Sequence, residues 1–430
     1  MRIIRVISLI VIFIGFLCIY AFAVRHVLLG GQRFGNFTEP IKSFIEFPML
    51  INRVFTGDPK PYHVTVEDDF LEINLLEDDL YALNAHYEPD KYIYVLSNLR
   101  NDSMLHSWSF PKSQFVGPSN MFPVAHPKNP VLLKDKSMIG MLNGTKNLFR
   151  LDRNSNVVWH NTSKIFHHSL NLSKDDYLWC CTEDKSFTKN EGEGSIIEFR
   201  DDFITKVDVE TGEILFDMSL SEILIRNGYI NMVHGFGNEE RSEGTDLFHL
   251  NDIEPIFFSG KYWNEGDLFL SLRNRSLILH YRPSSNRILR VISGPFLLQH
   301  DVDILSETEV SIFNNNRTHT MKVAEENKLP DEAIKFTIKS SNIVIYNFFD
   351  STFRTPSIDV FESEIIYTGW QGIHAYLSNG DLFVESTQSG KIYVIRDNEI
   401  ILRKYPNAVT ENNTTEYPHW MRIYETLNFN

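Results

Sequence analysis

Cysteine is scarce in this sequence, and dense clusters of basic residues are missing altogether. Three cysteines occur in 430 residues, and none of them belongs to a C-x-x-C pair. The sequence therefore provides neither a disulfide framework nor a thiolate metal site. The charge balance is acidic, with 41 Lys and Arg against 56 Asp and Glu and a formal net charge of -15. Because phosphate binding needs dense Lys and Arg patches, nucleic acid is excluded as a partner.

Two of the cysteines, Cys180 and Cys181, are adjacent in the apolar stretch YLWCC. Neighbouring residues of a strand point to opposite faces of its sheet. We therefore expect one buried thiol and one less buried thiol, with no bond between them.

One long apolar run stands at the N-terminus. Residues 6–24, VISLIVIFIGFLCIYAFAV, carry no charge, and 19 such residues can cross a hydrocarbon core of about 30 Å as a helix. Arg2 and Arg5 precede the run, which predicts that the rest of the chain lies on the non-cytoplasmic side, whether periplasmic, lumenal or extracellular. The small-x-small sequence at residues 21–23 supports the alternative of a cleaved signal peptide. We favour an uncleaved signal-anchor over residues 1–25.

The rest of the chain divides by pattern into residues 26–85 and 86–430. In the first part, EPIKSFIEFPMLINRVF and EDDFLEINLLEDDLYAL place apolar residues near helical spacing, which predicts a short, partly helical stalk. From about residue 86 onward, short apolar strands alternate with turns such as Asn143-Gly144 and Asn379-Gly380. The abundance of aromatic residues also favours sheets over helices.

A histidine recurs near the start of similar β units, at His168, His249, His300 and His374. Counting the strands before His168, the pattern gives six units of three or four strands, which predicts an all-β chain folded as a six-bladed β-propeller. A β-solenoid or a pair of β-sandwiches is the alternative. In a propeller the first strand of each blade lines the central channel, so we expect the four histidines to converge on the axis.

Strand alternation predicts which side chains share a face with these histidines. His249 and Asn251 should both point into the channel mouth, whereas Asp252 points away. Ser271, Arg273 and Arg275 should share a face of the next strand, which makes Arg273 a candidate anion clamp. Asp301 does not share a face with His300, so we expect it to brace a neighbouring backbone or blade.

Two kinds of chemistry fit several histidines beside an amide and an arginine. One is metal binding, although the H-x-N and H-D patterns do not place a carboxylate on the same face as a histidine. The other is anion chemistry, in which a neutral imidazole attacks an electrophilic centre and the remaining groups stabilise the charge of the transferring group. We expect neither a metal nor another cofactor. A non-catalytic membrane-anchored propeller that binds carbohydrate or protein stays open, as does a metal-dependent hydrolase or lyase.

At these residues the chain resembles the arylsulfotransferase (aryl-sulfate sulfotransferase) family. The matching stretches cover roughly residues 80–400 in family order, and they are PVLLKDKSMIG, HHSLNLSKDDYLW, HLNDIEPI, GDLFLSLRNRSLILHY, SGPFLLQHDVDIL and GWQGIHAYLSNGDLFVES. The combination of H-x-N, GD-L-x-x-S-x-R and QHD carries the resemblance. The stretch after QHD, VDILSETEV to SIFNNN, departs from the family pattern, and the separate N-terminal β-sandwich of larger bacterial members has no room here.

The resemblance implies transfer of a sulfuryl group from a phenolic sulfate ester to a phenolic acceptor, without the nucleotide donor PAPS, through a sulfated histidine. It assigns that histidine to His300. It assigns sulfuryl binding and the handling of the phenolic proton to His249, Asn251, Arg273 and His168. Thr387 in ESTQSG and His374 are the candidate substrate-binding residues, although no family role carries over to His374. The expected partners are thus the aryl sulfate donor, the phenolic acceptor and a membrane, with no indication of oligomeric state.

Overall fold

The protein divides into two compact units, residues 1–62 and residues 63–430. The computed structural model describes residues 63–88, 90–115, 126–190, 192, 194–234, 246–318 and 338–427, together with Phe13, Gly15 and Tyr20. The predicted anchor and the predicted stalk up to residue 62 therefore lie almost wholly outside the described residues. None of the helices in the described part of the chain has the length and apolar character needed to cross a membrane.

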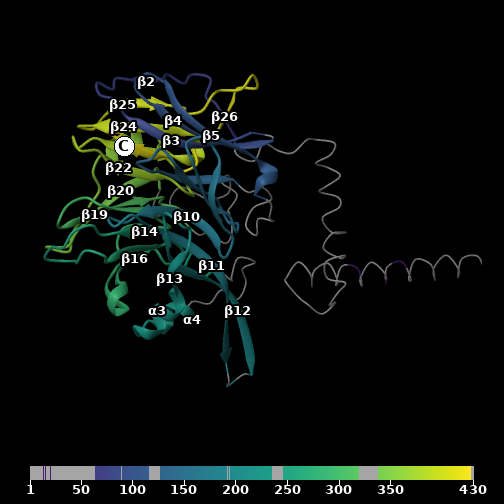
Figure 1. Ribbon diagram of the computed structural model, residues 1–430. Coiled ribbons are helices and arrows are strands. Elements are labelled where there is room, and N and C mark those ends of the chain that lie inside the picture. The colour runs from purple at the N-terminus through teal and green to yellow at the C-terminus, as the bar shows by residue number, and fades with distance from the viewer. Residues whose placement is uncertain are drawn as a thin grey trace, which may run out of the picture. The chain divides into compact units, whose positions relative to one another are not determined.

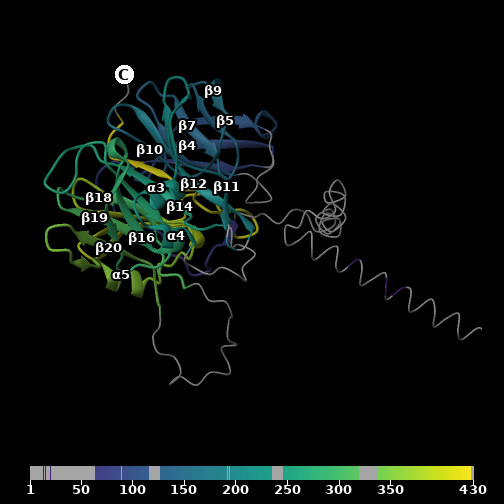
Figure 2. The ribbon, with the colours of Figure 1, turned by 90° about the horizontal axis from the view of Figure 1, so that it is seen from below.

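The second unit is a six-bladed β-propeller, as predicted; Figure 1 and Figure 2 show its sheets from two perpendicular directions. Each blade is an antiparallel sheet that starts at the centre. The first three blades, from the innermost strand outward, are β27 (Arg422–Tyr424), β3 (Tyr81–Tyr87), β4 (Lys91–Asn98) and β5 (Met104–Pro111); β6 (Pro127–Leu132), β7 (Met138–Leu142), β8 (Leu148–Leu151) and β9 (Val157–Asn161); and β10 (Ile165–Leu172), β11 (Tyr177–Asn190), β12 (Ser195–Asp208) and β13 (Ile214–Ser219).

The other three blades follow in chain order. They are β14 (Leu250–Pro255), β15 (Leu268–Leu272), β16 (Leu277–Arg282) and β17 (Arg287–Ile292); β18 (His300–Ile304), β19 (Glu309–Asn314), β20 (Asn342–Asn347) and β21 (Phe353–Arg354); and β22 (Ile373–Tyr376), β23 (Leu382–Ser386), β24 (Lys391–Arg396), β25 (Glu399–Lys404) and β2 (Ile73–Asn74). Short helices α3 (Leu220–Arg226), α4 (Ile230–His234) and α5 (Ile358–Ser363) lie in the connections.

Contacts between innermost strands arrange the blades in a ring. β6 packs against β10, β10 against β14, β14 against β18, and β18 against β22. The ring is closed by β27, a C-terminal strand that pairs with β3 from the start of the unit. Closure of this kind joins the two ends of the propeller in one sheet, an arrangement in which only short, protected edges remain.

The hydrophobic core lies between neighbouring blades. Val131 of the second blade packs in one cluster with Leu170 and Cys180 of the third. The opposite face of the third blade contributes Cys181 to a cluster that includes Leu250 of the fourth. Because both faces of the blade are covered, both thiols are fully buried, and the expectation of a less buried thiol is wrong. The two cysteines are free, as expected.

Part of the predicted stalk belongs to the propeller. β1 (His63–Thr65) pairs with β26 (Thr414–Glu416), β2 is the outermost strand of the last blade, and β3 starts at Tyr81. The apolar spacing in EDDFLEINLLEDDLYAL resembles that of a helix, but these residues instead pair with strands from the C-terminal end of the chain. Pairing partners more than 300 residues away leave no local signal in a sequence.

Candidate functional site

A β-bulge recurs in the innermost strand of four consecutive blades. The register of β6, β10, β14 and β18 shifts after Lys128, His167, Leu250 and His300, respectively. Bulges re-aim side chains and are common next to active sites. His168, at the bulge of β10, and His249, directly before β14, adopt φ values of 58° and 55°. The left-handed region costs a non-glycine residue about 1–2 kcal/mol, and such strain clusters at functional sites.

One polar side chain ties each bulged strand to the next blade. In each case it accepts a hydrogen bond from a backbone N–H of the next innermost strand: Asn129 from Leu170 (3.1 Å), Ser169 from Ile253 (3.3 Å), Asp252 from Val302 (2.8 Å) and Asp301 from His374 (2.7 Å). The prediction that Asp301 braces a neighbouring blade is confirmed. These four braces also identify equivalent positions in the repeat. The residues directly before the braces are Lys128, His168, Asn251 and His300.

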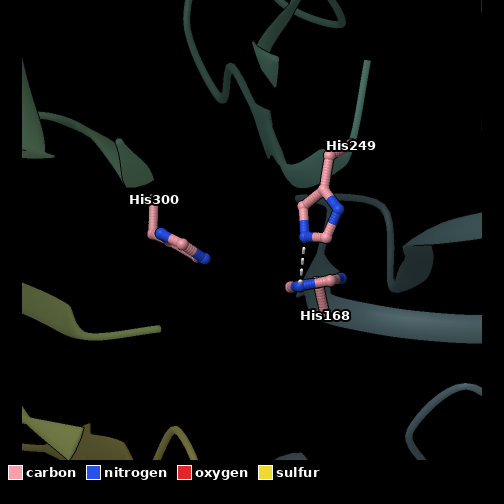
Figure 3. Close-up of side chains that lie close together, drawn as sticks. All are labelled: His168, His249 and His300. Atoms are coloured by element: carbon pink, nitrogen blue, oxygen red, sulfur yellow. Dashed lines mark hydrogen bonds between the residues drawn. The ribbon is translucent and has the colours of Figure 1, made fainter. Parts of the chain in front are cut away.

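Three of the four recurring histidines meet at the centre of the propeller (Figure 3). The Nε2 atoms of His168 and His249 are 3.2 Å apart, and one ring nitrogen from each of His168, His249 and His300 lies within 4.8 Å of the others. The ring centroids of His168 and His300 are 6.1 Å apart. The expected convergence of histidines is thus confirmed for three residues from three different blades.

Asn315 fixes the tautomer of His300. Nδ1 of His300 lies 2.7 Å from Oδ1 of Asn315. The amide nitrogen of Asn315 donates to the carbonyl oxygens of Thr368 (2.8 Å) and Gln371 (2.6 Å), so the amide oxygen must face the ring. Nδ1 therefore carries the proton and Nε2 carries the lone pair. The backbone N–H of Gln371 approaches this Nε2 to 3.3 Å.

Burial, followed by the charge of Arg273, lowers the pKa of His300 well below its ordinary value of 6.5. The ring is therefore neutral at pH 7. A neutral ring with Nδ1 protonated leaves Nε2 as a nucleophile or a ligand atom.

His249 is paired with the carboxylate of Asp246. The distance from Nδ1 of His249 to Oδ2 of Asp246 is 2.5 Å, and Arg200 also contacts this carboxylate. Burial opposes ionisation of Asp246, but His249 and Arg200 outweigh burial, so the pKa of Asp246 is lowered and it stays charged. Burial lowers the pKa of His249, and Asp246 offsets part of that shift. A carboxylate in this position orients the imidazole and stabilises its protonated form.

A chain of rings continues from His249 into the protein. Nδ1 of His168 is 2.8 Å from Nδ1 of His167, and Nε2 of His167 is 3.4 Å from Asp202. Burial lowers the pKa of His168 well below 6.5 and that of His167 to about 4, so both rings are neutral at pH 7. Burial raises the pKa of Asp202 to about 7. Asp246 and Asp202 thus stand at the two ends of a row of three imidazoles.

Arg273 lies beside the histidines but not on a strand. β15 ends at Leu272, and residues Arg273–Arg275 form a 3-10 helix, so the predicted alternation of Ser271, Arg273 and Arg275 along one strand is wrong. The backbone N–H of Arg273 donates to the carbonyl oxygen of His249 at 3.2 Å. After burial, the charge of Arg273 is among the causes that lower the pKa of both His249 and His300. The guanidinium therefore acts on two of the three rings.

Asn251 supports the backbone that carries His300. Its Nδ2 donates to the carbonyl oxygen of Gln299 at 2.8 Å, and the Gln299 amide donates in turn to Ser271 at 3.2 Å. The Oδ1 atom of Asn251 is buried without a hydrogen-bond partner among the described residues. Asn251 occupies the position in its blade that His168 and His300 occupy in theirs.

The two candidate substrate-binding residues, His374 and Thr387, do not belong to the cluster of three rings. His374 is aligned with Val302 by its brace, two positions beyond His300, and its ring bonds Asp301 (2.7 Å) and Ser311 (2.8 Å). The hydroxyl of Thr387 donates to Glu385 and accepts the backbone N–H of Gly372 at 3.1 Å, next to Gln371. His374 is therefore an inter-blade contact and Thr387 supports a loop. The sequence could not reveal this because the bulges change the register from blade to blade.

Sequence reasoning missed Asp246, Asn315 and Lys128. Asp246 stands three residues before His249, a spacing that could have been noticed. Asn315 lies in the run Asn314-Asn315-Asn316, inside the stretch that departs from the family pattern. Lys128 becomes visible only when Lys128-Asn129 is aligned with His168-Ser169 and His300-Asp301 through the braces.

Among the residues that the structure describes, two groups of side chains could hold a metal ion. The first is His168, His249 and His300, and the second is Asp301, Asp303 and His374. Neutral imidazole nitrogens suit zinc, copper or iron. A separate pocket of about 470 Å³ lies between β3, β4 and β5 and includes Asp79, Trp108 and Leu427, but it contains none of the three central histidines.

The fold and this site define a six-bladed propeller with a histidine cluster and an arginine at its centre. The family model described as arylsulfotransferase (ASST) matches residues 129–406, a range that contains His168, His249, Arg273 and His300. The chain belongs to the arylsulfotransferase family. A search of curated protein sequences gives no significant match.

The solved structures that match this chain are remote from it in sequence. One is a protein of unknown function from Bacteroides caccae, at 10% identity and a TM-score of 0.48, covering 80% of this chain and 98% of that one. Another is virginiamycin B lyase from Staphylococcus aureus, at 10% identity and a TM-score of 0.38, covering 78% of this chain and 87% of that one.

Proposed function

We propose that this protein transfers a sulfuryl group from a phenolic sulfate ester to a phenolic acceptor, with His300 as the residue that carries the group between them. Membership of the arylsulfotransferase family supports the reaction class. The observation that carries the assignment of His300 is its fixed tautomer. Asn315 accepts a hydrogen bond from Nδ1 at 2.7 Å, which leaves the lone pair on the buried Nε2 of a neutral ring, where the Gln371 N–H approaches it to 3.3 Å.

In the first half-reaction, the Nε2 lone pair of His300 attacks sulfur and the bond from sulfur to the aryl oxygen breaks. The Nδ1 proton stays on the ring and remains bonded to Asn315, so the sulfated ring keeps its orientation. The sulfate ester is an anion, and Arg273 offsets the charge that would repel the incoming lone pair. Electrostatic stabilisation by pre-positioned groups is commonly the largest single contribution to catalysis.

His249 handles the phenolic proton. In its protonated form, stabilised by Asp246, it gives the Nε2 proton to the departing phenolate and becomes neutral. In the second half-reaction the acceptor phenol returns a proton to His249 while its oxygen attacks sulfur, and the bond to His300 breaks. Protons and charge balance over the cycle. Before the first step, the Nε2 proton of His249 is directed at Nε2 of His168, 3.2 Å away, which orients the donor ring.

Purified protein incubated with p-nitrophenyl sulfate and an acceptor phenol tests the reaction. We expect nitrophenolate release that depends on the acceptor, with kinetics in which one product leaves before the second substrate reacts. His300→Ala should abolish turnover and keep the fold, whereas His106→Ala on the outermost strand β5 serves as the matched control. Turnover of His300→Ala at a rate near that of the unmodified protein would exclude the nucleophile assignment.

A metal-dependent hydrolase or lyase is the second candidate, and one observation favours it. The three ring nitrogens lie within 4.8 Å of one another, close enough for one ion to contact all three. Metal analysis of the purified protein distinguishes the two candidates. A stoichiometric ion whose removal stops the reaction would favour this candidate over sulfuryl transfer through His300.

We also propose that residues 1–25 anchor the propeller on the non-cytoplasmic side of a membrane, as the apolar run after Arg2 and Arg5 predicts. Protease treatment of intact cells and of sealed inverted vesicles tests the orientation. Cleavage of the propeller only from the cytoplasmic side would contradict it.

A further inference from the structure

Lys128 occupies, in the second blade, the position that His168 and His300 occupy in theirs. It lies in the innermost strand β6, directly before the brace residue Asn129 and at the start of the bulge. Its side chain is completely buried. The repeat that directs two imidazoles to the centre of the propeller thus directs a primary amine there as well.

The ring of Trp420 lies 4.0 to 5.9 Å from both the amine of Lys128 and two of the central histidines. Nζ is 4.0 Å from the centroid of the Trp420 ring. That ring is in turn 5.8 Å from the ring of His168 and 5.9 Å from the ring of His300, between centroids. After burial, the charge of Lys128 is among the causes that lower the pKa of His168 and His300. The two histidines therefore experience the field of this amine directly.

Within the described part of the chain, Nζ of Lys128 has no hydrogen-bond partner. The other well-buried lysines differ in this respect: Lys404 is paired with Asp102, and Lys391 is paired with Glu67 at 2.6 Å. Burial lowers the pKa of Lys128 to about 7, and the charge of Glu385, which does not bond Nζ, offsets only part of that shift. An ammonium group that is buried without a hydrogen-bond partner destabilises the fold, and the cation–π contact of Nζ with Trp420 offsets only part of that cost.

We propose that Lys128 is an anion-binding residue of the central site, whose ammonium group donates a hydrogen bond to a non-bridging oxygen of the sulfuryl group. The geometry carries the inference: a buried amine with unused donors lies over the Trp420 ring, and the same ring is 5.9 Å from the nucleophilic ring of His300. Lys128 and Arg273 then supply two cations to the transferring group from two different blades. The identity of the anion as a sulfate ester rests on the proposed function, whereas the presence of an oxyanion site does not.

Inorganic sulfate is the probe, and isothermal titration calorimetry of the full chain is the measurement. Lys128→Met keeps the length and apolar packing of the side chain and removes the charge. Loss of a charge-assisted hydrogen bond to the anion should weaken sulfate binding roughly 10- to 100-fold. Lys174→Met, which removes one exposed lysine from a hairpin, is the matched control and should bind sulfate as the unmodified protein does.

Thermal unfolding without sulfate separates an anion-binding role from a structural one. Removing an unpaired buried amine should leave the melting temperature of Lys128→Met equal to or higher than that of the unmodified protein. A structural lysine would instead make the variant less stable. If Lys128→Met does not fold, Lys128→Gln replaces it, and the same two measurements apply.

The outcomes separate this inference from the proposed function. Equal sulfate affinity of Lys128→Met and the unmodified protein, or no sulfate binding by the unmodified protein, would overturn the role of Lys128. Sulfate binding that depends on Lys128, in a protein that releases no phenol from any aryl sulfate, would support the oxyanion site and reject sulfuryl transfer. Sulfuryl transfer with sulfate binding that is insensitive to Lys128 would support the proposed function and reject the role of Lys128.

Discussion

Replacement of Asp246 by asparagine tests the proton-transfer role of His249. The substitution preserves shape but removes the negative charge 2.5 Å from Nδ1 of His249. With charge centres about 4 Å apart and an effective dielectric constant of about 20, the lost attraction is about 4 kcal/mol. The amide oxygen of the asparagine can still accept a hydrogen bond from Nδ1 of His249, so part of the stabilisation is retained. Asp246→Asn should therefore destabilise the protonated form of His249 by about 2–4 kcal/mol. The rate of a step that requires this form should fall roughly 30- to 1,000-fold.

Whether the reaction requires protonated His249 depends on the leaving group, so two donors with different leaving groups can be compared in one assay. Unsubstituted phenyl sulfate releases a basic phenolate that needs a proton, whereas p-nitrophenyl sulfate releases a stable anion. In single-turnover experiments, the rate at which Asp246→Asn is sulfated should therefore fall by the full amount, roughly 30- to 1,000-fold, with phenyl sulfate and only slightly with p-nitrophenyl sulfate. Asp175→Asn on an exposed turn is the control for loss of one carboxylate. An equal loss with both donors would refute the assignment of His249 as the proton donor.

Three further predictions concern the same site. Arg273→Ala should raise the activation free energy that determines kcat/KM by about 2.7–4 kcal/mol, the range for removing one donor to a developing oxyanion. A decrease of kcat/KM below tenfold would contradict its role. Burial and Arg273 lower the pKa of His300 below 6.5, so kcat/KM for p-nitrophenyl sulfate should stay constant as the pH falls to 6.5 and somewhat below. A decrease of kcat/KM on acidification with its midpoint above pH 6.5 would contradict this. Asn315→Ala should lower kcat more than it raises KM, because the residues that bind the sulfate ester remain while the His300 ring is no longer held in one tautomer. An unchanged kcat in steady-state assays would count against the orienting role of Asn315.

The sequence was sufficient for the architecture because the signal for a propeller is repetitive. Six groups of short strands and turns predict six blades, and a histidine that recurs in the first strand predicts a position on the axis. His168, His249 and His300 were found in this way. The ring closure by β27 and the outermost strand β2 were not, because both depend on pairing between opposite ends of the chain.

The details of the site depend on backbone irregularities that a sequence does not reveal. Reasoning from regular repeats and regular strands predicts that His374 is equivalent to His300, but the bulge in β18 shifts the register, and His374 is aligned with Val302 instead. The same reasoning extended β15 through Arg273, where the chain turns into a 3-10 helix. Lys128 was missed because a lysine does not resemble the histidines that it replaces in the repeat.

Trapping of the sulfated enzyme tests the central claim most directly. Protein incubated with an aryl sulfate in the absence of acceptor is quenched at alkaline pH, digested and analysed by mass spectrometry. We predict one added SO3 group per chain, on the peptide that contains His300, which disappears when a phenol is added before quenching. Acceptor-dependent transfer without any such adduct, or with the SO3 group on a residue other than His300, would contradict the account.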